Sequence, residues 1–203
     1  PAPVAITCSP VKGIPATQEF TARLATAGHD VVPHLAARMV ASADAAAELA
    51  DWVRSVGLTE VFVIAGDPPA PHGPYAEVVP FLSDFLGALP GVARVGVAGY
   101  PDGHALIDDD VLDEALLAKQ ALLDDHGFGG WVSTQMCFDA DTTLAWLRRQ
   151  RDRGLELPVR LGVPGVVDQV RLMKVGARLG VGASLRYLAK NRATVVRLMT
   201  PGG

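Results

Sequence analysis

Cysteine is scarce in this chain of 203 residues: Cys8 and Cys137 are its only two, too few for a disulfide framework. Neither takes part in a metal-ligand spacing, and no constellation of His, Cys, Asp and Glu in the sequence suggests a metal site. The cysteine usage therefore predicts a protein of a reducing, cytoplasmic compartment that holds no metal.

Long apolar runs and an excess of positive charge are also lacking. No stretch reaches the roughly 18 apolar residues that span a bilayer, and the first residues do not resemble a signal peptide. The net charge of −4 gives no electrostatic case for binding nucleic acid or an anionic membrane. Four arginines gather between Arg148 and Arg153, where interleaved Gln150 and Asp152 indicate a solvated helix end. We expect a small-molecule substrate, with neither nucleic acid nor membrane as a partner.

The sequence does contain six apolar runs, each followed by an amphipathic stretch. This alternation predicts strands of a parallel sheet that are connected by helices. The expected strands are Val4–Cys8, Val32–Ala36, Glu60–Ala65, Ala93–Ala98, Trp131–Thr134 and Val159–Val163. The expected helices are Thr17–Ala27, Ala43–Val56, Tyr75–Leu89, Asp109–Asp125, Asp141–Arg153, Val167–Leu179 and Ser184–Met199. Ser42 and Asp141 are the expected N-caps, and glycines follow the helices as stops.

Two architectures fit this pattern, a doubly wound sheet and a (β/α)8 barrel. The barrel is favoured because polar residues follow every strand, whereas a doubly wound sheet gathers its site at one topological switch point. The first turn, Ser9 to Gly13, is not a dinucleotide fingerprint. A complete barrel has eight strands and about 250 residues. We therefore expect a single domain, residues 1–203, that forms an incomplete (β/α)8 TIM barrel whose first and last strands are missing or partial.

Two strand ends carry side chains suited to binding and proton chemistry. Asp67 lies between Gly66 and Pro68-Pro69, so that its carboxylate could accept hydrogen bonds from a ligand or tune a proton transfer. Gln135 can both donate and accept hydrogen bonds, which suits the edge of a heterocycle. A turn-forming aspartate and a glutamine bonded to backbone are the structural alternatives, and both stay open.

Two histidines and a tyrosine lie at the ends of other apolar runs: His34 ends the run Val31-Val32-Pro33, and Tyr100 and His104 follow Ala93–Ala98. His34 and His104 could contact phosphate or ribose, or carry a proton. Tyr100 could stack on a planar ligand. Purely structural roles, such as closing the top of the barrel, are the alternatives for all three. No activated serine or cysteine is evident, so covalent catalysis has little support.

Several of these strand ends together resemble the methylenetetrahydrofolate reductase family. The most specific segment is residues 96–104, Gly-Val-Ala-Gly-Tyr-Pro-Asp-Gly-His. The shorter matches are Ile6-Thr7 with Gly13, Pro33-His34-Leu35, Gly66-Asp67-Pro68, Thr134-Gln135 with Phe138-Asp139, and Pro164-Gly165. Their order along the chain follows the series of strands and helices. The resemblance spans nearly the whole chain and implies the barrel fold.

The resemblance also implies an activity. The family reduces 5,10-methylenetetrahydrofolate to 5-methyltetrahydrofolate with NADH or NADPH, usually through FAD, and so feeds methionine synthesis. By position, Asp67 resembles the family's aspartate near the flavin and the pterin, and Gln135 resembles its folate-binding glutamine. A carboxylate there would stabilise positive charge that develops on the opened ring. Other matching residues are expected to line the cofactor or folate site at one shared pocket mouth: Thr7, His34, Gly66, Tyr100 and His104.

The sequence also departs from the family's pattern. Nothing matches the family's acid, a glutamate on the first strand, so a fragment of this extent is expected to be inactive. Ala65 stands where the family has arginine, and Lys119 lies further back than the family's lysine. The aromatic residue expected after Pro164-Gly165 is absent as well. Because a flavin diphosphate needs positive charge or helix N-termini, we expect weak or no FAD binding and direct hydride transfer from the nicotinamide.

Two further readings remain open. The barrel could serve another folate or pterin enzyme, such as a folate-dependent demethylase, since the stacking aromatic is missing. It could also be a non-catalytic homologue that binds folate or flavin. The sequence does not distinguish NADH from NADPH or indicate an oligomeric state.

Overall fold

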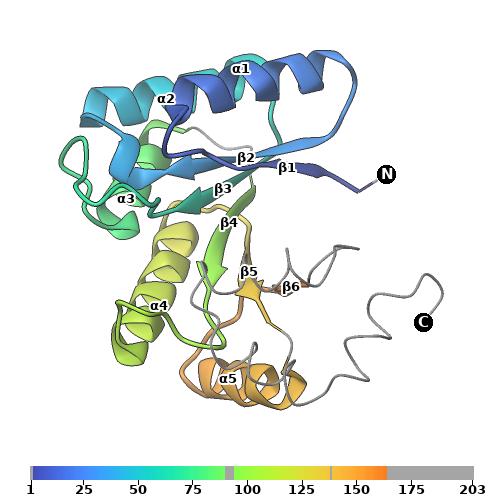
Figure 1. Cartoon of the computed structure of the whole chain (residues 1–203), viewed down its shortest axis with the longest axis vertical. Coiled ribbons are helices and arrows are strands. Elements are labelled where there is room, and N and C mark those ends of the chain that lie inside the picture. Colours follow the sequence, from blue (N-terminus) through green and yellow to red (C-terminus); the bar gives the residue numbers. More distant parts are fainter. Residues whose placement is uncertain (1, 90–93, 138, 164–203) are drawn as a thin grey trace. The chain divides into compact units, whose positions relative to one another are not determined.

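The computed structural model describes residues 2–89, 94–137 and 139–163, in which strands and helices alternate (Figure 1). The elements are β1 (Val4–Ile6), α1 (Gly13–Thr26), β2 (Val31–Ala36), the 3-10 turn η1 (Ala37–Met39), α2 (Ala43–Val56), β3 (Glu60–Ile64), α3 (Val78–Ala88), β4 (Arg94–Gly99), α4 (Asp109–Asp125), β5 (Gly130–Met136), α5 (Ala140–Asp152) and β6 (Val159–Gly162). The helices expected over Val167–Leu179 and Ser184–Met199 lie outside the described residues.

The six strands form one sheet in the order β1-β2-β3-β4-β5-β6. Strand β2 runs parallel to β1, with Val31 beside Val4, and β3 runs parallel to β2, with Phe62 beside His34. Strand β4 is parallel to β3, with Gly96 beside Phe62. Strands that stay in chain order without a reversal are the topology of a (β/α)8 barrel, whereas a doubly wound sheet reverses at its switch point. The fold is therefore an incomplete (β/α)8 TIM barrel, as the sequence predicts.

The chain divides into two compact units, each described here by itself. The first unit consists of Pro1–Val97 and Ala118–Trp131, and the second of Ala98–Leu117 and Val132–Gly203. The boundary thus runs through β4 and β5, so that the first unit holds β1 to β3 and most of β4.

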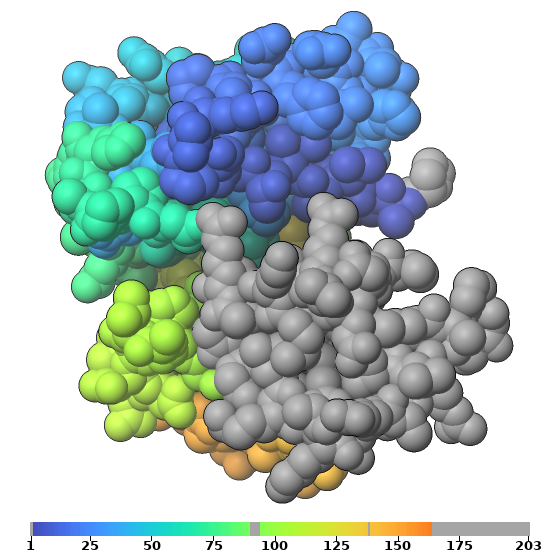
Figure 2. All heavy atoms as spheres, viewed as in Figure 1, coloured from blue at the N-terminus to red at the C-terminus, as the bar shows by residue number. Residues whose placement is uncertain are grey.

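Alternation along the strands builds the core of the first unit. Val61, Val63, Val95 and Val97 occupy every second position of β3 and β4 and are fully buried. Helix α2 contributes residues at helical spacing, with Ala46, Leu49, Ala50 and Val53 all buried. Figure 2 shows an outer face of this unit, with its amino-terminal residues in blue. The apolar stripes that predicted the helices therefore do face a core.

The ends of several helices follow the expected chemistry. The Ser42 hydroxyl accepts a hydrogen bond from the Ala45 N–H at 3.1 Å and caps α2, as predicted. The expectation for α5 is wrong by two residues: the N-cap is Asp139, whose carboxylate accepts from the Asp141 and Thr142 N–H groups at 3.0 and 3.3 Å. The glycine stops within the described residues have positive φ, namely Gly28, Gly57, Gly127 and Gly154.

A close approach of rings explains one glycine of β4 in the first unit. A Cβ on Gly96 would lie 2.4 Å from Cζ2 of Trp131 and 2.6 Å from Cδ2 of Phe62. The two rings stack with centroids 6.5 Å apart, and the Arg94 guanidinium lies 5.6 Å from the Trp131 ring centroid. The glycine therefore leaves room for an aromatic layer across β3, β4 and β5.

Gly96→Ala is expected to destabilise the protein by about 1–3 kcal/mol, because the added methyl group overpacks this layer. Urea unfolding followed by tryptophan fluorescence measures the change. Gly87→Ala is the matched control, since nothing lies within 4 Å of a Cβ there and alanine favours a helix interior such as that of α3. Equal stability of the wild type and Gly96→Ala would contradict the packing described.

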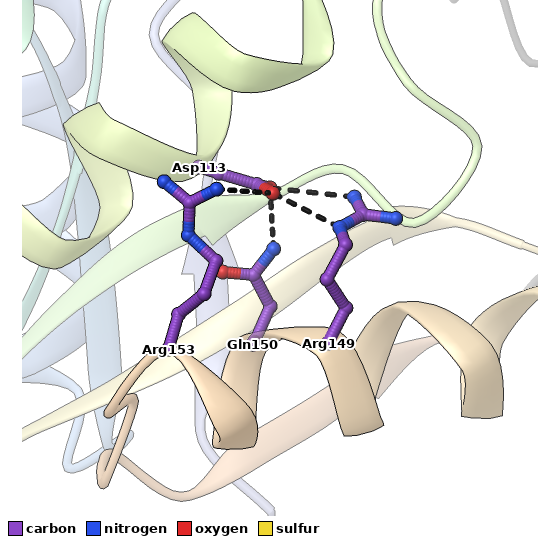
Figure 3. A network of polar contacts seen from close by, with 4 residues as sticks. All are labelled: Asp113, Arg149, Gln150 and Arg153. Atoms are coloured by element: carbon purple, nitrogen blue, oxygen red, sulfur yellow. Dashed lines mark hydrogen bonds and ion pairs between the residues drawn. The ribbon is translucent and has the colours of Figure 1, made fainter.

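A buried carboxylate organises the helices of the second unit (Figure 3). Asp113 of α4 is 3% exposed and accepts a hydrogen bond from Nε of Arg149 at 3.0 Å. The side-chain amide of Gln150 donates to Oδ1 of the same carboxylate, and Nη1 of Arg153 lies 3.7 Å from Oδ2. Asp113 raises the pKa of the Arg149 guanidinium through this contact. The arginine cluster therefore holds α5 against α4. The sequence predicts only a solvated helix end here, and not this contact.

Candidate active site

The first unit holds four of the expected site residues at one edge of its strands. Because β1, β2 and β3 are parallel neighbours, their carboxyl ends lie along the same edge, with Ile6 beside Pro33 and Ala36 beside Ile64. Three of the four lie just after a strand: Thr7 comes directly after β1, and Gly66 and Asp67 come shortly after β3. His34 lies inside β2 rather than after it.

Asp67 is exposed in a turn that the backbone of its neighbours shapes. Gly66 has a φ of +91°, and a Cβ there would lie 2.9 Å from Cβ of Ala36 at the end of β2. Both facts favour glycine, since other residues rarely adopt this φ. The adjacent Pro68 is buried, so the turn packs against the unit while the Asp67 carboxylate faces outward into solvent. This geometry suits a carboxylate that meets a ligand.

His34 is a neutral residue in this setting. Its ring lies 4.8 Å from the Phe62 ring, centroid to centroid, at an interplanar angle of 52°. Burial lowers the pKa of His34 to about 4, because the imidazolium would lose its hydration. Near neutral pH the imidazole can therefore donate or accept a hydrogen bond and offer a flat surface, without bringing positive charge.

This pKa predicts how stability depends on pH. The unfolded chain binds a proton at His34 below about pH 6.5, while the folded protein binds it only near pH 4. Acidification from pH 6.5 to 4 should therefore remove stability, on the order of 3 kcal/mol from this residue. His34→Gln should show a smaller loss between these pH values in urea unfolding, and an NMR titration of His34 near 6.5 would contradict the prediction.

In the second unit, Tyr100 and His104 lie together after β4. Their rings are 5.5 Å apart, edge to face at 82°. The turn between them is closed by the Gly103 N–H, which donates to the Tyr100 carbonyl at 3.0 Å. The Leu106 N–H donates to Nδ1 of His104 at 3.2 Å. A ring pair held in this way can present one aromatic edge to a planar ligand.

Gln135 lies at an irregularity of β5 in the same unit. The sequence predicts a strand that ends at Thr134, with Gln135 after it. The strand instead continues to Met136, so Gln135 lies within β5. The register with β6 shifts between Ser133 and Met136, and such bulges re-aim side chains, often beside active sites. Oε1 of Gln135 accepts from the Met136 N–H at 3.1 Å. The backbone-bonded alternative is thus present, at a position where the strand is interrupted.

The structure groups the expected residues by unit. The first unit contains Thr7, His34, Gly66 and Asp67, and the second contains Tyr100, His104 and Gln135. One pocket mouth shared by all seven stays a prediction. No motif or spacing points to Arg38, whose side chain hydrogen-bonds to the loop that carries Asp67. Long-range contacts of this kind leave no periodic or motif signal in a single sequence.

A comparison with protein families now identifies the chain's relatives. The model of the family described as methylenetetrahydrofolate reductase matches residues 15–179. The chain belongs to the methylenetetrahydrofolate reductase family. This result confirms the resemblance seen at the strand ends, and the matched stretch includes β2, β3, β4, β5 and β6.

Individual relatives in the methylenetetrahydrofolate reductase family are distant. Methylenetetrahydrofolate reductase 1 of Schizosaccharomyces pombe is 33% identical over 69 residues, which cover 34% of this chain and 11% of that protein. Methylenetetrahydrofolate reductase 2 of Saccharomyces cerevisiae is 28% identical over 119 residues, 55% of this chain and 19% of that protein. The matches thus span less than a fifth of either relative.

A solved structure agrees with the fold. A lyase/mutase-type protein of Burkholderia cenocepacia J2315 superposes with a TM-score of 0.50 at 21% identity, over 93% of this chain and 72% of that one. At this identity the likeness supports the fold alone. Within the described ranges no helix is long and apolar enough to cross a membrane, and no three His, Cys, Asp or Glu side chains gather as metal ligands do.

The family generally uses FAD, and the side chains of Arg38 and Lys119 are already engaged or buried. Ala65 replaces the family's arginine beside Gly66. The guanidinium of the nearby Arg38 is hydrogen-bonded to three backbone carbonyls. Lys119 is buried in α4, where desolvation lowers its pKa to about 8. Neither of these two side chains presents a solvent-facing cation to a diphosphate.

Proposed function

We propose that this chain is the reductase part of an enzyme that converts 5,10-methylenetetrahydrofolate into 5-methyltetrahydrofolate with NADH or NADPH. The observation that carries the proposal is the family match, which runs across the strand ends where Asp67, Tyr100 and Gln135 lie. The exposed Asp67 carboxylate in its rigid turn supports a role in the reaction.

The proposed chemistry opens the five-membered ring of the substrate and then reduces it. N10 takes up a proton from solvent water, its bond to the methylene carbon breaks with the electron pair going to N10, and the N5 lone pair forms an N5 iminium cation. Hydride from the nicotinamide then forms a C–H bond at that carbon, the C=N electron pair returns to N5, and NAD(P)+ leaves. Asp67 would stabilise the iminium, because an anion near the cation lowers the barrier to ring opening. Gln135 and Tyr100 would hold the pterin by hydrogen bonding and stacking.

A neutral His34 suits direct transfer. An uncharged imidazole beside the reacting rings adds no positive charge that would destabilise the iminium. It can contact the nicotinamide or the pterin through its ring face or a hydrogen bond. Because Ala65 has no charge, Arg38 is bonded to backbone carbonyls and Lys119 is buried, we propose that the enzyme passes hydride directly between the two substrates.

Anaerobic oxidation of NADH and of NADPH by the full-length protein, with and without added FAD, tests this function. The proposal predicts oxidation that depends on methylenetetrahydrofolate, 5-methyltetrahydrofolate as product, and no requirement for FAD. Purification with stoichiometric bound flavin would overturn direct transfer. Absence of folate-dependent turnover under every condition would overturn the reductase proposal and favour a folate-binding homologue.

A further inference from the structure

The loop that carries Asp67, residues 65–77 between β3 and α3, is bonded at several points to one side chain from the turn after β2. Arg38 of η1 donates hydrogen bonds from its guanidinium to three carbonyls of this loop. Nε reaches Pro68 at 2.9 Å, Nη2 reaches Pro69 at 2.9 Å, and Nη1 reaches Ala76 at 2.8 Å. One planar fork therefore joins the beginning and the end of the loop.

The backbone of Arg38 takes part in the same arrangement. Its N–H donates to the Ala65 carbonyl at 2.9 Å, and its carbonyl accepts from the His72 N–H at 2.8 Å. Three parts of the loop, its start, middle and end, are thus bonded to one residue. A mobile surface loop would show no such convergence of bonds on a residue about 30 positions away in sequence.

The composition of the loop explains why it needs an arginine. Pro68 and Pro69 are two of its four prolines, which have no N–H to form a regular ladder with a neighbour. Their carbonyls still require donors, and the guanidinium supplies several in one plane. A lysine would supply a single ammonium group, which cannot reach three separated carbonyls in the same way.

Two other contacts fix the far half of the loop. The Tyr75 hydroxyl donates to Oδ2 of Asp84 in α3 at 2.6 Å, and Tyr75 is 2% exposed. A Cβ on Gly73 would lie 2.3 Å from the Ala41 carbonyl oxygen. The end of the loop is therefore anchored to α3 and to the chain after η1, and Arg38 determines where its beginning, with Asp67, is held.

We propose that Arg38 is the positioning residue of this site: it holds the Asp67 loop in place and links it to β2, the strand of His34. The inference rests on the proposed role of Asp67. Arg38 lies four residues after His34, in the turn η1 that directly follows β2, so the residue that holds the Asp67 loop is next to the end of the strand that carries His34. The arginine acts through the loop backbone and does not touch the reacting atoms.

Arg38→Lys tests the proposal, because it keeps the positive charge and removes the guanidinium group that donates to three carbonyls. We expect kcat for folate-dependent NAD(P)H oxidation to fall by about tenfold or more, since small misplacements of a catalytic group are costly. KM should change much less. Arg54→Lys is the control, an arginine on α2 that forms an exposed ion pair with Asp51, and it should retain wild-type kcat.

A double-variant cycle separates positioning from a general loss of stability. If Arg38 acts through Asp67, Arg38→Lys combined with Asp67→Asn should be no slower than Asp67→Asn alone. The inference would be overturned if the double variant lost kcat by the product of the two single losses, or if Arg38→Lys kept the wild-type kcat. If the wild type reduces methylenetetrahydrofolate, either of these two outcomes overturns only the role of Arg38 and leaves the proposed function intact. A wild type without this activity contradicts the proposed function itself.

Hydrogen exchange gives a readout that needs no turnover. In the wild type, the His72 amide should exchange slowly, because it is bonded to Arg38. In Arg38→Lys, amides between Gly66 and Ala76 should exchange faster while those of α2 stay unchanged. A wild-type loop that exchanges as fast as a free chain would overturn the inference even if the variant does not fold.

Discussion

Replacing Asp67 with asparagine is expected to lower kcat for methylenetetrahydrofolate reduction by about 100- to 1,000-fold, the cost of losing one stabilising group in an active site. The amide keeps the shape of the side chain and removes its negative charge. The iminium formed on ring opening would then lose its anionic partner, so the loss should appear in kcat. The measurement is anaerobic NAD(P)H oxidation under saturating folate.

A matched variant separates this effect from a change of surface charge. Asp30 is exposed and lies just before β2, at the amino end of the strand and so at the opposite edge from Asp67. Asp30→Asn should retain wild-type activity. If Asp67→Asn also retains it with an unchanged fold by circular dichroism, Asp67 is the turn-forming residue of the structural alternative and the proposed mechanism is wrong.

The largest expected effect on stability belongs to Asp113 of α4. Asp113→Ala should lower the free energy of unfolding by about 2–4 kcal/mol, because removing one partner of a buried polar network leaves others unsatisfied. Gln150 is fully buried and would lose the acceptor of its side-chain amide, and its Oε1 already has no partner among the described residues. Arg149 and Arg153 are partly exposed and can turn to water, which limits the loss.

Urea unfolding monitored by circular dichroism measures this change. Glu114→Ala is the control, because Glu114 is the next residue on α4 and is exposed. It should change the stability by no more than about 0.5 kcal/mol. Wild-type stability in Asp113→Ala would show that desolvation of the carboxylate offsets its hydrogen bonds, as in some buried ion pairs, and would contradict a stabilising role for the arginine cluster.

The alternation of strands and helices could be predicted because it depends on local patterns. Apolar runs, apolar stripes and glycine stops located every described strand and α-helix but not the 3-10 turn η1, and the chain order of the strands confirmed the barrel. The boundaries were less accurate. Helix α1 begins at Gly13 and not Thr17, and α3 begins at Val78 and not Tyr75. Tyr75 instead bonds to Asp84 and packs on Phe81, a tertiary contact that no helical spacing can reveal.

The N-cap of α5 shows the same limit. Asp139 and Asp141 are both good capping residues, and only the direction in which the chain enters the helix decides between them. The φ of −97° and ψ of 106° at Asp139 place it before the first turn. The sequence contains the cap chemistry and leaves its position ambiguous by two residues.

The candidate site divides along similar lines. Asp67, Gln135 and Tyr100 could be selected because polar residues at strand ends of a barrel are typical of binding sites. The neutral state of His34 could not, since it follows from burial beside Phe62. Arg38 could not be predicted either, and nor could Asp113 outside the site, because their partners lie about 30 or more residues away in the chain.

Transfer of a labelled hydride tests the central claim most directly. Full-length protein is incubated anaerobically with methylenetetrahydrofolate and NADH or NADPH that carries deuterium at the transferred position, and the product is analysed by mass spectrometry. The account predicts 5-methyltetrahydrofolate with deuterium in its methyl group. Failure to form any 5-methyltetrahydrofolate, with folate and nicotinamide both recovered unchanged, would contradict it.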